Sequence, residues 1–235
     1  MDFDVAIIGG GSAGYSAAST AQSLGARVAI IDPGPLGGLC ILKGCMPTKT
    51  ILRSSDIMAL MRRAKEFGIQ SVDPQAHLPD INDRKNKLIK EFADYRIEQL
   101  NDSRFTLIQE HAEFISAHKI RIGDKTLKAK SFIIATGSVI VDYPISGLEE
   151  TGFVTSDDVL KMREAPESII VLGAGAVAVE LAQFLLRIGV KVTLLQRSSH
   201  ILSSGDEDLA RPVETRLRKE GMNLYTGTKL LRTKK

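Results

Sequence analysis

The chain repeats one pattern of apolar and polar positions. Its first copy starts with the apolar run Phe3–Ile8, passes through a glycine-rich turn into a helix-like stretch of small residues, and closes with the run Arg27–Ile31. The second copy places similar runs, Ser168–Leu172 and Lys191–Leu195, on either side of the helical stretch Val179–Ile188. Short apolar runs rich in β-branched residues are typical of buried strands, and strands that alternate with helices form parallel sheets. We therefore predict an α/β protein with two βαβ units, each built on a parallel sheet.

The first glycine-rich turn has the spacing of a dinucleotide-binding motif. Its glycines stand at the G-x-G-x-x-G positions, namely Gly9, Gly11 and Gly14. The first permits a tight turn, the second lets the backbone approach a pyrophosphate, and the third lets the helix pack closely on the strand. The helix that starts with Ser12 and Ala13 then directs backbone N–H groups at the phosphates. Asp32, 18 residues past Gly14, is the expected ribose ligand, although it could instead be a solvated acid beside a plain glycine turn.

The second turn repeats the spacing with two changes. Its nucleotide-binding positions are Gly173, Gly175, Ala176 and Val177, and Ala178 replaces the third glycine. The acid at the end of the second strand is also lost, because Gln196 and Arg197 stand there. An arginine in place of the carboxylate favours a 2′-phosphate over a free 2′-hydroxyl, so we expect NADP(H) rather than NAD(H) at this site. The alternative is that Arg197 only points to solvent.

The residues between the two copies predict a helix, a surface connection and a small β-meander. Leu88–Leu100 has the pattern of an amphipathic helix, and Gly68–Asp83, with two prolines, that of a surface connection. The strand-like runs of a meander that returns to the first sheet are Phe105–Ile108, Glu113–Ser116, Lys119–Ile122 and Phe132–Ala135. Val141–Pro166 is the expected crossover to the second sheet, which Met222–Tyr225 and Thr228–Arg232 would extend.

Composition indicates a globular protein and excludes several classes of partner. Of the 235 residues, 43% are hydrophobic and 25% are charged, which allows a sizeable core. The net charge is only +3, so nucleic acid is not an expected partner. No apolar run reaches the roughly 18 residues of a membrane span, and the N-terminus lacks the pattern of a signal peptide. We therefore expect a cytoplasmic protein without a membrane partner.

Both cysteines of the chain lie in one short segment, Gly37–Lys49. In a reducing compartment a close pair is more often redox-active or metal-binding than structural. A metal site is disfavoured, because the four histidines are scattered and the chain has no C-x-x-C spacing. Residues five apart in a regular helix lie about 8 Å apart between Cα atoms, whereas a disulfide spans at most about 7 Å. A Cys40–Cys45 disulfide therefore requires a distorted helix start, which Gly44 would permit, and a helix N-terminus also favours the thiolate.

The same segment resembles a family signature. Gly37-Gly38-Leu39-Cys40 and Gly44-Cys45-Met46-Pro47-Thr48-Lys49 are similar to the G-G-x-C-x-x-x-x-G-C-x-P-x-K motif of the pyridine nucleotide-disulfide oxidoreductases, which include dihydrolipoamide dehydrogenase, mercuric reductase and glutathione reductase. The resemblance runs along the whole chain and implies two Rossmann-like domains, an FAD-binding domain at residues 1–145 and an NAD(P)-binding domain at residues 146–235. It also implies that further positions bind FAD together with the Gly9 turn: Gly38, Lys49, Ala112, Ala135, Thr136 and Gly137.

The resemblance gives each reactive side chain an expected role. Electrons would pass between the nicotinamide, the flavin and a redox-active Cys40–Cys45 disulfide, with Cys45 facing the flavin and Cys40 meeting the substrate. Lys49 and Glu180 match the family's ion pair beside the flavin, where a positive charge assists hydride chemistry; both could instead be solvated helix charges. The expected substrate is a lipoyl-type dithiol, as in dihydrolipoamide dehydrogenase, and a mercuric or glutathione-type reductase is the alternative.

Several family features are absent from the sequence. Relatives continue into a dimerisation domain that contributes a catalytic His-Pro motif, and none of the four histidines precedes a proline. We therefore expect an N-terminal portion of such an enzyme, with an incomplete second domain, and a homodimer for the full-length protein. Ala176 stands where glutathione reductases carry a tyrosine, which favours the other two types, while Arg197 argues against the NAD preference of dihydrolipoamide dehydrogenases. A non-catalytic nucleotide-binding module with redox-sensing thiols is the alternative from a different class.

Overall fold

The protein forms two compact units, each made of two separate segments of the chain. The computed structural model describes residues 1–70, 73–141 and 144–234. Unit 1 comprises Met1–Pro47 and Asn86–Val139, and unit 2 comprises Thr48–Lys85 and the chain from Ile140 onward. The predicted FAD-binding domain (residues 1–145) and NAD(P)-binding domain (residues 146–235) are defined by the nucleotide that each binds, and this division stays a prediction.

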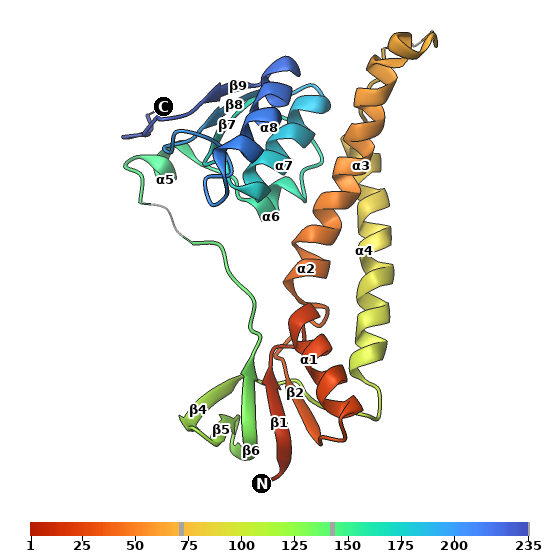
Figure 1. The fold of residues 1–235 in the computed structure, drawn as a ribbon, viewed down its shortest axis with the longest axis vertical. Helices are drawn as coiled ribbons and strands as arrows, with labels where there is room; N and C mark the ends of the chain where they lie inside the picture. Colours follow the sequence, from red (N-terminus) through yellow and green to blue (C-terminus); the bar gives the residue numbers. More distant parts are fainter. Residues whose placement is uncertain (71–72, 142–143, 235) are drawn as a thin grey trace. The chain divides into compact units, whose positions relative to one another are not determined.

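Unit 1 is built on a six-stranded sheet with the strand order β3-β2-β1-β6-β5-β4 (Figure 1). Its elements are β1 (Phe3–Ile8), α1 (Ser12–Ser23), β2 (Val28–Ile31), α2 (Gly38–Leu42), β3 (Thr106–Ile108), β4 (Ala112–Ser116), β5 (Lys119–Ile122) and β6 (Lys125–Ile134). The central strand β1 pairs in parallel with β2 and β6. Ile7 of β1 and Ile30 of β2 are fully buried. The first predicted βαβ unit is therefore confirmed.

The predicted meander is confirmed for three of its four runs. β4, β5 and β6 are antiparallel neighbours, and β6 returns to the first sheet beside β1. The prediction was wrong for Phe105–Ile108, because β3 lies at the opposite edge of the sheet and pairs in parallel with β2. A short apolar run does not determine its own neighbour, since the same residues can bury one face in either pairing.

Unit 2 contains a three-stranded parallel sheet with the order β7-β8-β9, as the second βαβ pattern predicts. Its elements are α5 (Leu148–Thr151), α6 (Ser156–Val159), β7 (Ser168–Leu172), α7 (Ala176–Arg187), β8 (Lys191–Leu195), α8 (Glu207–Lys219) and β9 (Asn223–Tyr225). Its first segment comes from a helical hairpin of α3 (Cys45–Arg62), the 3-10 helix η1 (Ala64–Phe67) and α4 (Leu78–Leu100). Both long helices also contain residues of unit 1. In unit 2 the hairpin helices are joined by a hydrogen bond from the Arg84 side chain to the carbonyl of Thr50.

Two predicted boundaries near this unit are corrected by the structure. Helix α4 begins at Leu78, so the last part of the predicted surface connection Gly68–Asp83 is helical. Pro79 lies in the first turn of α4, where its missing N–H removes no helical hydrogen bond, so this proline opens a helix instead of marking a loop. The predicted strand Thr228–Arg232 is reduced to one isolated bridge at Arg232.

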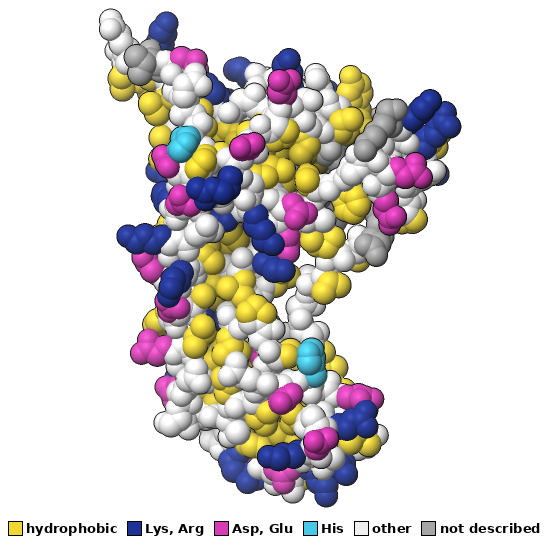
Figure 2. Space-filling model, turned by 180° about the vertical axis from the view of Figure 1, so that it is seen from behind, with side chains coloured by type: hydrophobic (Ala, Val, Ile, Leu, Met, Phe, Trp, Pro, Cys, Tyr) yellow, Lys and Arg dark blue, Asp and Glu magenta, His cyan; other side chains and the backbone are white. Residues whose placement is uncertain are grey.

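Each unit has its own apolar core. In unit 2, Phe184 of α7, Leu194 of β8 and Leu217 of α8 belong to one buried cluster with Ile51 of α3. Charged side chains of both signs are interspersed over the face drawn in Figure 2, in keeping with the small net charge. In the part of the chain that the structure describes, no helix combines the length and the apolar character that crossing a bilayer requires.

Candidate functional site

The turn after β1 is packed so tightly that it excludes side chains at two positions. Gly9 has a φ of +106°, in the left-handed region, and a Cβ at this position would overlap the carbonyl oxygen of Ala135 and lie 3.2 Å from the Cα of Thr136. A Cβ on Gly14 would overlap the carbonyl oxygen of Gly9. Helix α1 therefore lies directly on the end of β1, and the chain that leaves β6 lies against the same turn.

Helices α1 and α7 begin in the same way. Gly11 is the N-cap of α1 and Gly175 is the N-cap of α7, and in the described residues no side chain caps either helix by a hydrogen bond. The first helical residues, Ser12, Ala13 and Ala176, are exposed. The backbone N–H groups of both first turns are therefore available to an anion such as a pyrophosphate.

The carboxylate of Asp32 is fixed at the edge of the Gly9 turn. Its Oδ2 accepts a hydrogen bond from the N–H of Gly10 at 2.6 Å, and its Oδ1 accepts one from the N–H of Gly34 at 2.7 Å. Each carboxylate oxygen has a further lone pair, so Asp32 can still accept a ribose hydroxyl. Sequence reasoning missed these two backbone donors. The Asp-x-Gly spacing was the available signal for Gly34, because aspartate side chains often bond the N–H two residues on.

Three segments of unit 1 meet at the Gly9 turn. Gly38, with a φ of +73°, approaches Gly11 so closely that a Cβ on Gly38 would lie 2.5 Å from the Cα of Gly11. The exposed Gly137 follows β6, and a Cβ there would lie 4.0 Å from the Cβ of Leu39. The segment that leads to Cys40 therefore lies against the dinucleotide-type turn and beside the end of β6.

The helix is interrupted between the two cysteines, as a close approach of these residues requires. α2 ends at Leu42 and α3 begins at Cys45. A Cβ on Gly44 would lie 3.0 Å from the carbonyl oxygen of Leu39 and 3.1 Å from the Cα of Cys40, so only glycine fits here without displacing the backbone. Cys40 is half-buried and Cys45 is exposed, and both are thiols in this structure.

Helix α3 also carries the lysine of the predicted ion pair. Lys49 Nζ lies 2.5 Å from Glu180 Oε1 of α7, and both residues belong to unit 2. The Lys49 side chain is 59% exposed and that of Glu180 is 32% exposed, so the pair is open to solvent or to a ligand. Cys45 and Lys49 are four residues apart on one helix and therefore share a face.

The second glycine turn is open around Gly173, and the two polar residues predicted to bind its nucleotide differ in access. Nothing lies within 4 Å of a Cβ built on Gly173, and Val177 is 57% exposed. Gln196 is buried, and its amide donates to the hydroxyl of Ser203 at 3.2 Å. Arg197 is exposed at the end of β8. Of the two residues, Arg197 is the one that a nucleotide can reach without rearrangement.

The remaining predicted position, Ala112, lies in the meander. It begins β4, pairs with Ile122 of β5 and packs against the apolar cluster of that part of the sheet. Its predicted contact with FAD stays a prediction.

The sequence matches one known family over almost its whole length. The profile of the family described as "Pyridine nucleotide-disulphide oxidoreductase" matches residues 3–235. The chain belongs to this family. The resemblance of the cysteine segment and the predicted fold class are thereby confirmed.

Individual relatives within the pyridine nucleotide-disulphide oxidoreductases fall into more than one type. The chain is 34% identical to a mercuric reductase of Staphylococcus aureus, over 96% of this chain and 42% of that protein. It is 31% identical to a dihydrolipoyl dehydrogenase of Bacillus subtilis (strain 168), over 96% of this chain and 51% of that protein. Among solved structures, it is similar to the Cu(II) complex of the HOCl-induced flavoprotein disulfide reductase RclA from Escherichia coli, with a TM-score of 0.80 and 29% identity over 97% of this chain and 50% of that one. The chain thus spans about half the length of the relatives that it matches.

Proposed function

We propose that this chain is the FAD- and NAD(P)-binding portion of a disulfide oxidoreductase whose redox-active thiols are Cys40 and Cys45. The observation that carries the proposal is the close approach of the two cysteine segments at Gly44, in a stretch that also lies against the Gly9 turn through Gly38 and Gly11. A purely structural cysteine pair does not need to lie beside a dinucleotide-type turn, whereas a pair that exchanges electrons with a bound dinucleotide must lie close to it.

The residues of the Gly9 turn fit FAD. The backbone at Gly9 and Gly38 packs against neighbouring backbone with no room for a side chain, which holds the turn in a compact form. The start of α1 offers N–H groups to a pyrophosphate, and Asp32 suits a ribose hydroxyl. When bound, FAD supplies two-electron transfer between the nicotinamide and the thiols. We assign the second nucleotide to the Gly173 turn, with Arg197 as the ligand of the 2′-phosphate of NADP(H).

The two thiols have separate tasks in the proposed exchange. The thiolate of Cys40 attacks one sulfur of a substrate disulfide, which breaks the substrate S–S bond, releases one substrate thiolate and leaves a mixed disulfide. Cys45 then attacks the Cys40 sulfur of this mixed disulfide, forms the Cys40–Cys45 bond and releases the second substrate thiolate. With a dithiol substrate the same steps run in reverse. The start of α3 favours Cys45 as a thiolate, and Lys49, held by Glu180, places a positive charge on the same helix face.

We propose a lipoyl-type dithiol as the substrate and a homodimer as the form of the full-length protein. The similarity to dihydrolipoyl dehydrogenase supports this choice. The exposed, small Ala176 at the start of α7 leaves room for a nicotinamide and argues against the glutathione reductase type. Reduction of Hg(II) is the second candidate, because several relatives of similar identity are mercuric reductases. Turnover of the full-length protein with dihydrolipoamide and with a thiol complex of Hg(II) separates the two.

The roles of the thiols are tested in the full-length, FAD-loaded protein. Two-electron reduction of the unmodified protein cleaves the Cys40–Cys45 disulfide, and we expect the Cys45 thiolate then to give a long-wavelength absorption band with the oxidised flavin. Cys40→Ser should show this band before any reduction and Cys45→Ser should lack it, while both variants lose turnover with dihydrolipoamide. A band that persists in Cys45→Ser would show that this sulfur is not the one beside the flavin. Absence of turnover with any dithiol, disulfide or Hg(II) compound would favour the non-catalytic, redox-sensing alternative.

The nucleotide assignment is tested at Arg197. Loss of a charged hydrogen bond to a phosphate should raise the KM for NADPH about tenfold in Arg197→Ala, which corresponds to about 1.4 kcal/mol, and leave the KM for NADH unchanged. Arg218→Ala, which removes another exposed arginine of unit 2, is the matched control. A clear NADH preference of the unmodified protein would contradict the assignment.

A further inference from the structure

Helices α3 and α7 are joined by two ion pairs, and the positively charged residue lies on α3 in one pair and on α7 in the other. Besides Lys49 with Glu180, Asp56 of α3 receives a hydrogen bond from Arg187 of α7. Each member of the second pair lies seven residues beyond its counterpart in the first, and seven residues are close to two helical turns, so both pairs lie on one face of each helix. The two helices therefore run in the same direction with a fixed register.

The polarity of the two pairs opposes sliding of one helix along the other. The lysine of the first pair and the aspartate of the second lie on α3, and their partners lie on α7. A displacement by two turns would bring Lys49 to Arg187 or Asp56 to Glu180, which are like charges. A displacement by one turn would leave all four charges without their partners. Ile51 of α3 and apolar residues of α7 belong to one buried cluster. Apolar contacts do not distinguish one register of the two helices from another as charges do, so the ion pairs select the register.

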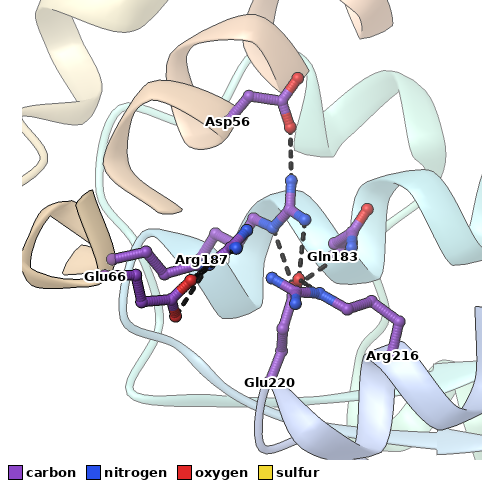
Figure 3. Close-up of polar contacts among 7 residues, drawn as sticks. Asp56, Glu66, Gln183, Arg187, Arg216 and Glu220 are labelled. Carbon is purple, nitrogen blue, oxygen red and sulfur yellow. Dashed lines mark hydrogen bonds and ion pairs between the residues drawn. The ribbon is translucent and has the colours of Figure 1, made fainter. Parts of the chain in front are cut away.

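Arg187 is held in place from the other side by Glu220 at the end of α8 (Figure 3). Its Nε donates to Glu220 Oε2 at 2.9 Å and its Nη2 donates to Glu220 Oε1 at 2.8 Å, which leaves Nη1 directed at Asp56. Gln183 and Arg216 also donate to Glu220. The side chains of Arg187 and Glu220 are only 13% and 11% exposed. A two-pronged bond in such a setting fixes the plane of the guanidinium group.

The last turn of α3 makes a further contact with the same arginine. Arg62 Nη1 donates to the main-chain carbonyl of Arg187 at 2.6 Å, at the C-terminal end of α7. The two helices are thus connected at Glu180 and again, by two bonds, at Arg187. The contacts at Arg187 do not involve the exposed Lys49 pair, so they can hold the helices while Lys49 faces a ligand.

We propose that the Asp56–Arg187 pair is a positioning clamp: it fixes the register of α3 against α7 and thereby holds Lys49 in contact with Glu180. This inference rests on the proposed function, because it gives the Lys49–Glu180 pair its task beside the flavin. Glu220 orients Arg187, Arg187 holds Asp56, and the nearly two helical turns of α3 between Lys49 and Asp56 transmit the register. Neither Asp56 nor Arg187 is a catalytic residue in this scheme. Loosening the clamp slows the step that needs Lys49 and leaves nucleotide affinity unchanged.

The test is a double-mutant cycle in the full-length, FAD-loaded protein. Asp56→Asn removes the clamp while Arg187 keeps its bond to Glu220, so no buried charge is orphaned and the fold is retained. Lys49→Met removes the group that the clamp positions. Asp83→Asn is the matched control, because it removes an exposed carboxylate of the same hairpin that is paired with another arginine, Arg163.

Rapid mixing with NADPH gives the first readout, the rate of flavin reduction. Asp56→Asn should slow it at least about fivefold at saturating NADPH, since small misplacements of positioned groups carry large costs in rate, with the half-saturating NADPH concentration unchanged. Asp83→Asn should not slow it. In the Lys49→Met background, Asp56→Asn should cause no further slowing. Equal slowing in both backgrounds, or none in either, would overturn the proposal.

Thermal unfolding of the same proteins without NADPH gives a readout independent of turnover. The shift of the unfolding midpoint for Asp56→Asn with Lys49→Met should differ from the sum of the single shifts by about 2 °C or more, because coupled sites are not additive. The pair Asp83→Asn with Lys49→Met should be additive. If the unmodified protein accepts no electrons from NADPH or NADH, the proposed function fails, and the unfolding cycle alone decides the clamp: additive shifts would refute it.

Discussion

Gly44 occupies a position where the chain has no room for a side chain. The constraint is not conformational, because this glycine is not in the left-handed region, but steric: backbone atoms of Leu39 and Cys40 stand 3.0 and 3.1 Å from its missing Cβ. The glycine thus lets the end of α2 approach the start of α3. The sequence motif places a glycine before Cys45, and the geometry supplies the reason.

We predict that Gly44→Ala lowers the free energy of unfolding by about 1–3 kcal/mol, the usual cost of overpacking, and slows oxidation of the Cys40–Cys45 pair. Thermal unfolding and thiol titration during oxidation measure the two effects. Gly205→Ala is the control, because the nearest atom to a Cβ there is 3.8 Å away. Equal unfolding midpoints and oxidation rates for Gly44→Ala and the unmodified protein would contradict the steric argument.

Residue identities at the two turns could be predicted from the sequence, whereas their partners could not. The motif spacing located Gly9, Asp32 and the cysteines, because turn chemistry is local. That Gly38 touches Gly11 and that Gly10 holds Asp32 depends on how distant segments meet, and no pattern of apolar and polar positions encodes this. The Lys49–Glu180 contact came from a family resemblance, not from spacing.

At the scale of elements, α7 and α8 are joined by a buried charge network. Burial by itself would raise the pKa of Glu220, but the hydrogen bonds from Arg187 and Arg216 and the charge of Arg187 outweigh it and lower the pKa from 4.5 to about 2. The folded state therefore prefers the carboxylate. Glu220 thus stabilises the fold above pH 4.5, and this contribution is lost as the pH falls from 4.5 towards about 2.

We predict that Glu220→Gln lowers the free energy of unfolding at neutral pH by about 3 kcal/mol and flattens its decline between pH 4.5 and about 2. Urea unfolding at a series of pH values measures both. Glu66→Gln is the control, since Glu66 pairs with Arg63 at an exposed site and should change little. A decline with falling pH that is the same in Glu220→Gln and in the unmodified protein would show that Glu220 is not its source.

Most helices and strands could be predicted from the sequence, and two of the failures have different causes. β1, β5, β7 and β8 match the predicted runs in full, because each has either a run of apolar residues, as in β7, or apolar residues that alternate with polar ones, as in β5. β3 was assigned to the wrong edge, and the start of α4 was missed because Pro79 was taken for a loop residue. For β3 the sequence indicates a strand but not its neighbour, whereas for α4 a proline is compatible both with a loop and with the first turn of a helix.

At the scale of the whole molecule, we expect unit 2 to stay assembled when the chain is cut between β6 and unit 2. Val139 and Val141 are 87% and 79% exposed and lie outside helices and strands. Unit 2 combines the hairpin residues 48–85 with the chain after residue 140, and these segments share an apolar core and the Asp56–Arg187 and Asp83–Arg163 pairs. After a cut near residue 140, residues 48–85 would belong to the first fragment and the rest of unit 2 to the second, and noncovalent contacts within unit 2 would hold the two fragments together.

We predict that limited proteolysis near Val139–Val141 gives two fragments that stay together on native gel filtration and separate in urea. Introducing a polar group into the shared core by Ile51→Asn should let the nicked fragments separate without urea, because an unsatisfied polar group in an apolar core costs about 1–3 kcal/mol. Mass spectrometry identifies the cut and the elution profile reports the association. Immediate separation of the unmodified fragments would contradict the argument.

The interleaving of the two units has a consequence for biosynthesis. On the ribosome, residues 48–85 emerge long before their partners in α7, so Ile51 and Leu78 leave the exit tunnel with no completed core to enter. At about 5–20 residues per second, translation leaves this nascent hairpin waiting for several seconds. Vectorial synthesis thus exposes apolar helix faces to chaperones, a cost that a contiguous arrangement of the same helices and strands would avoid.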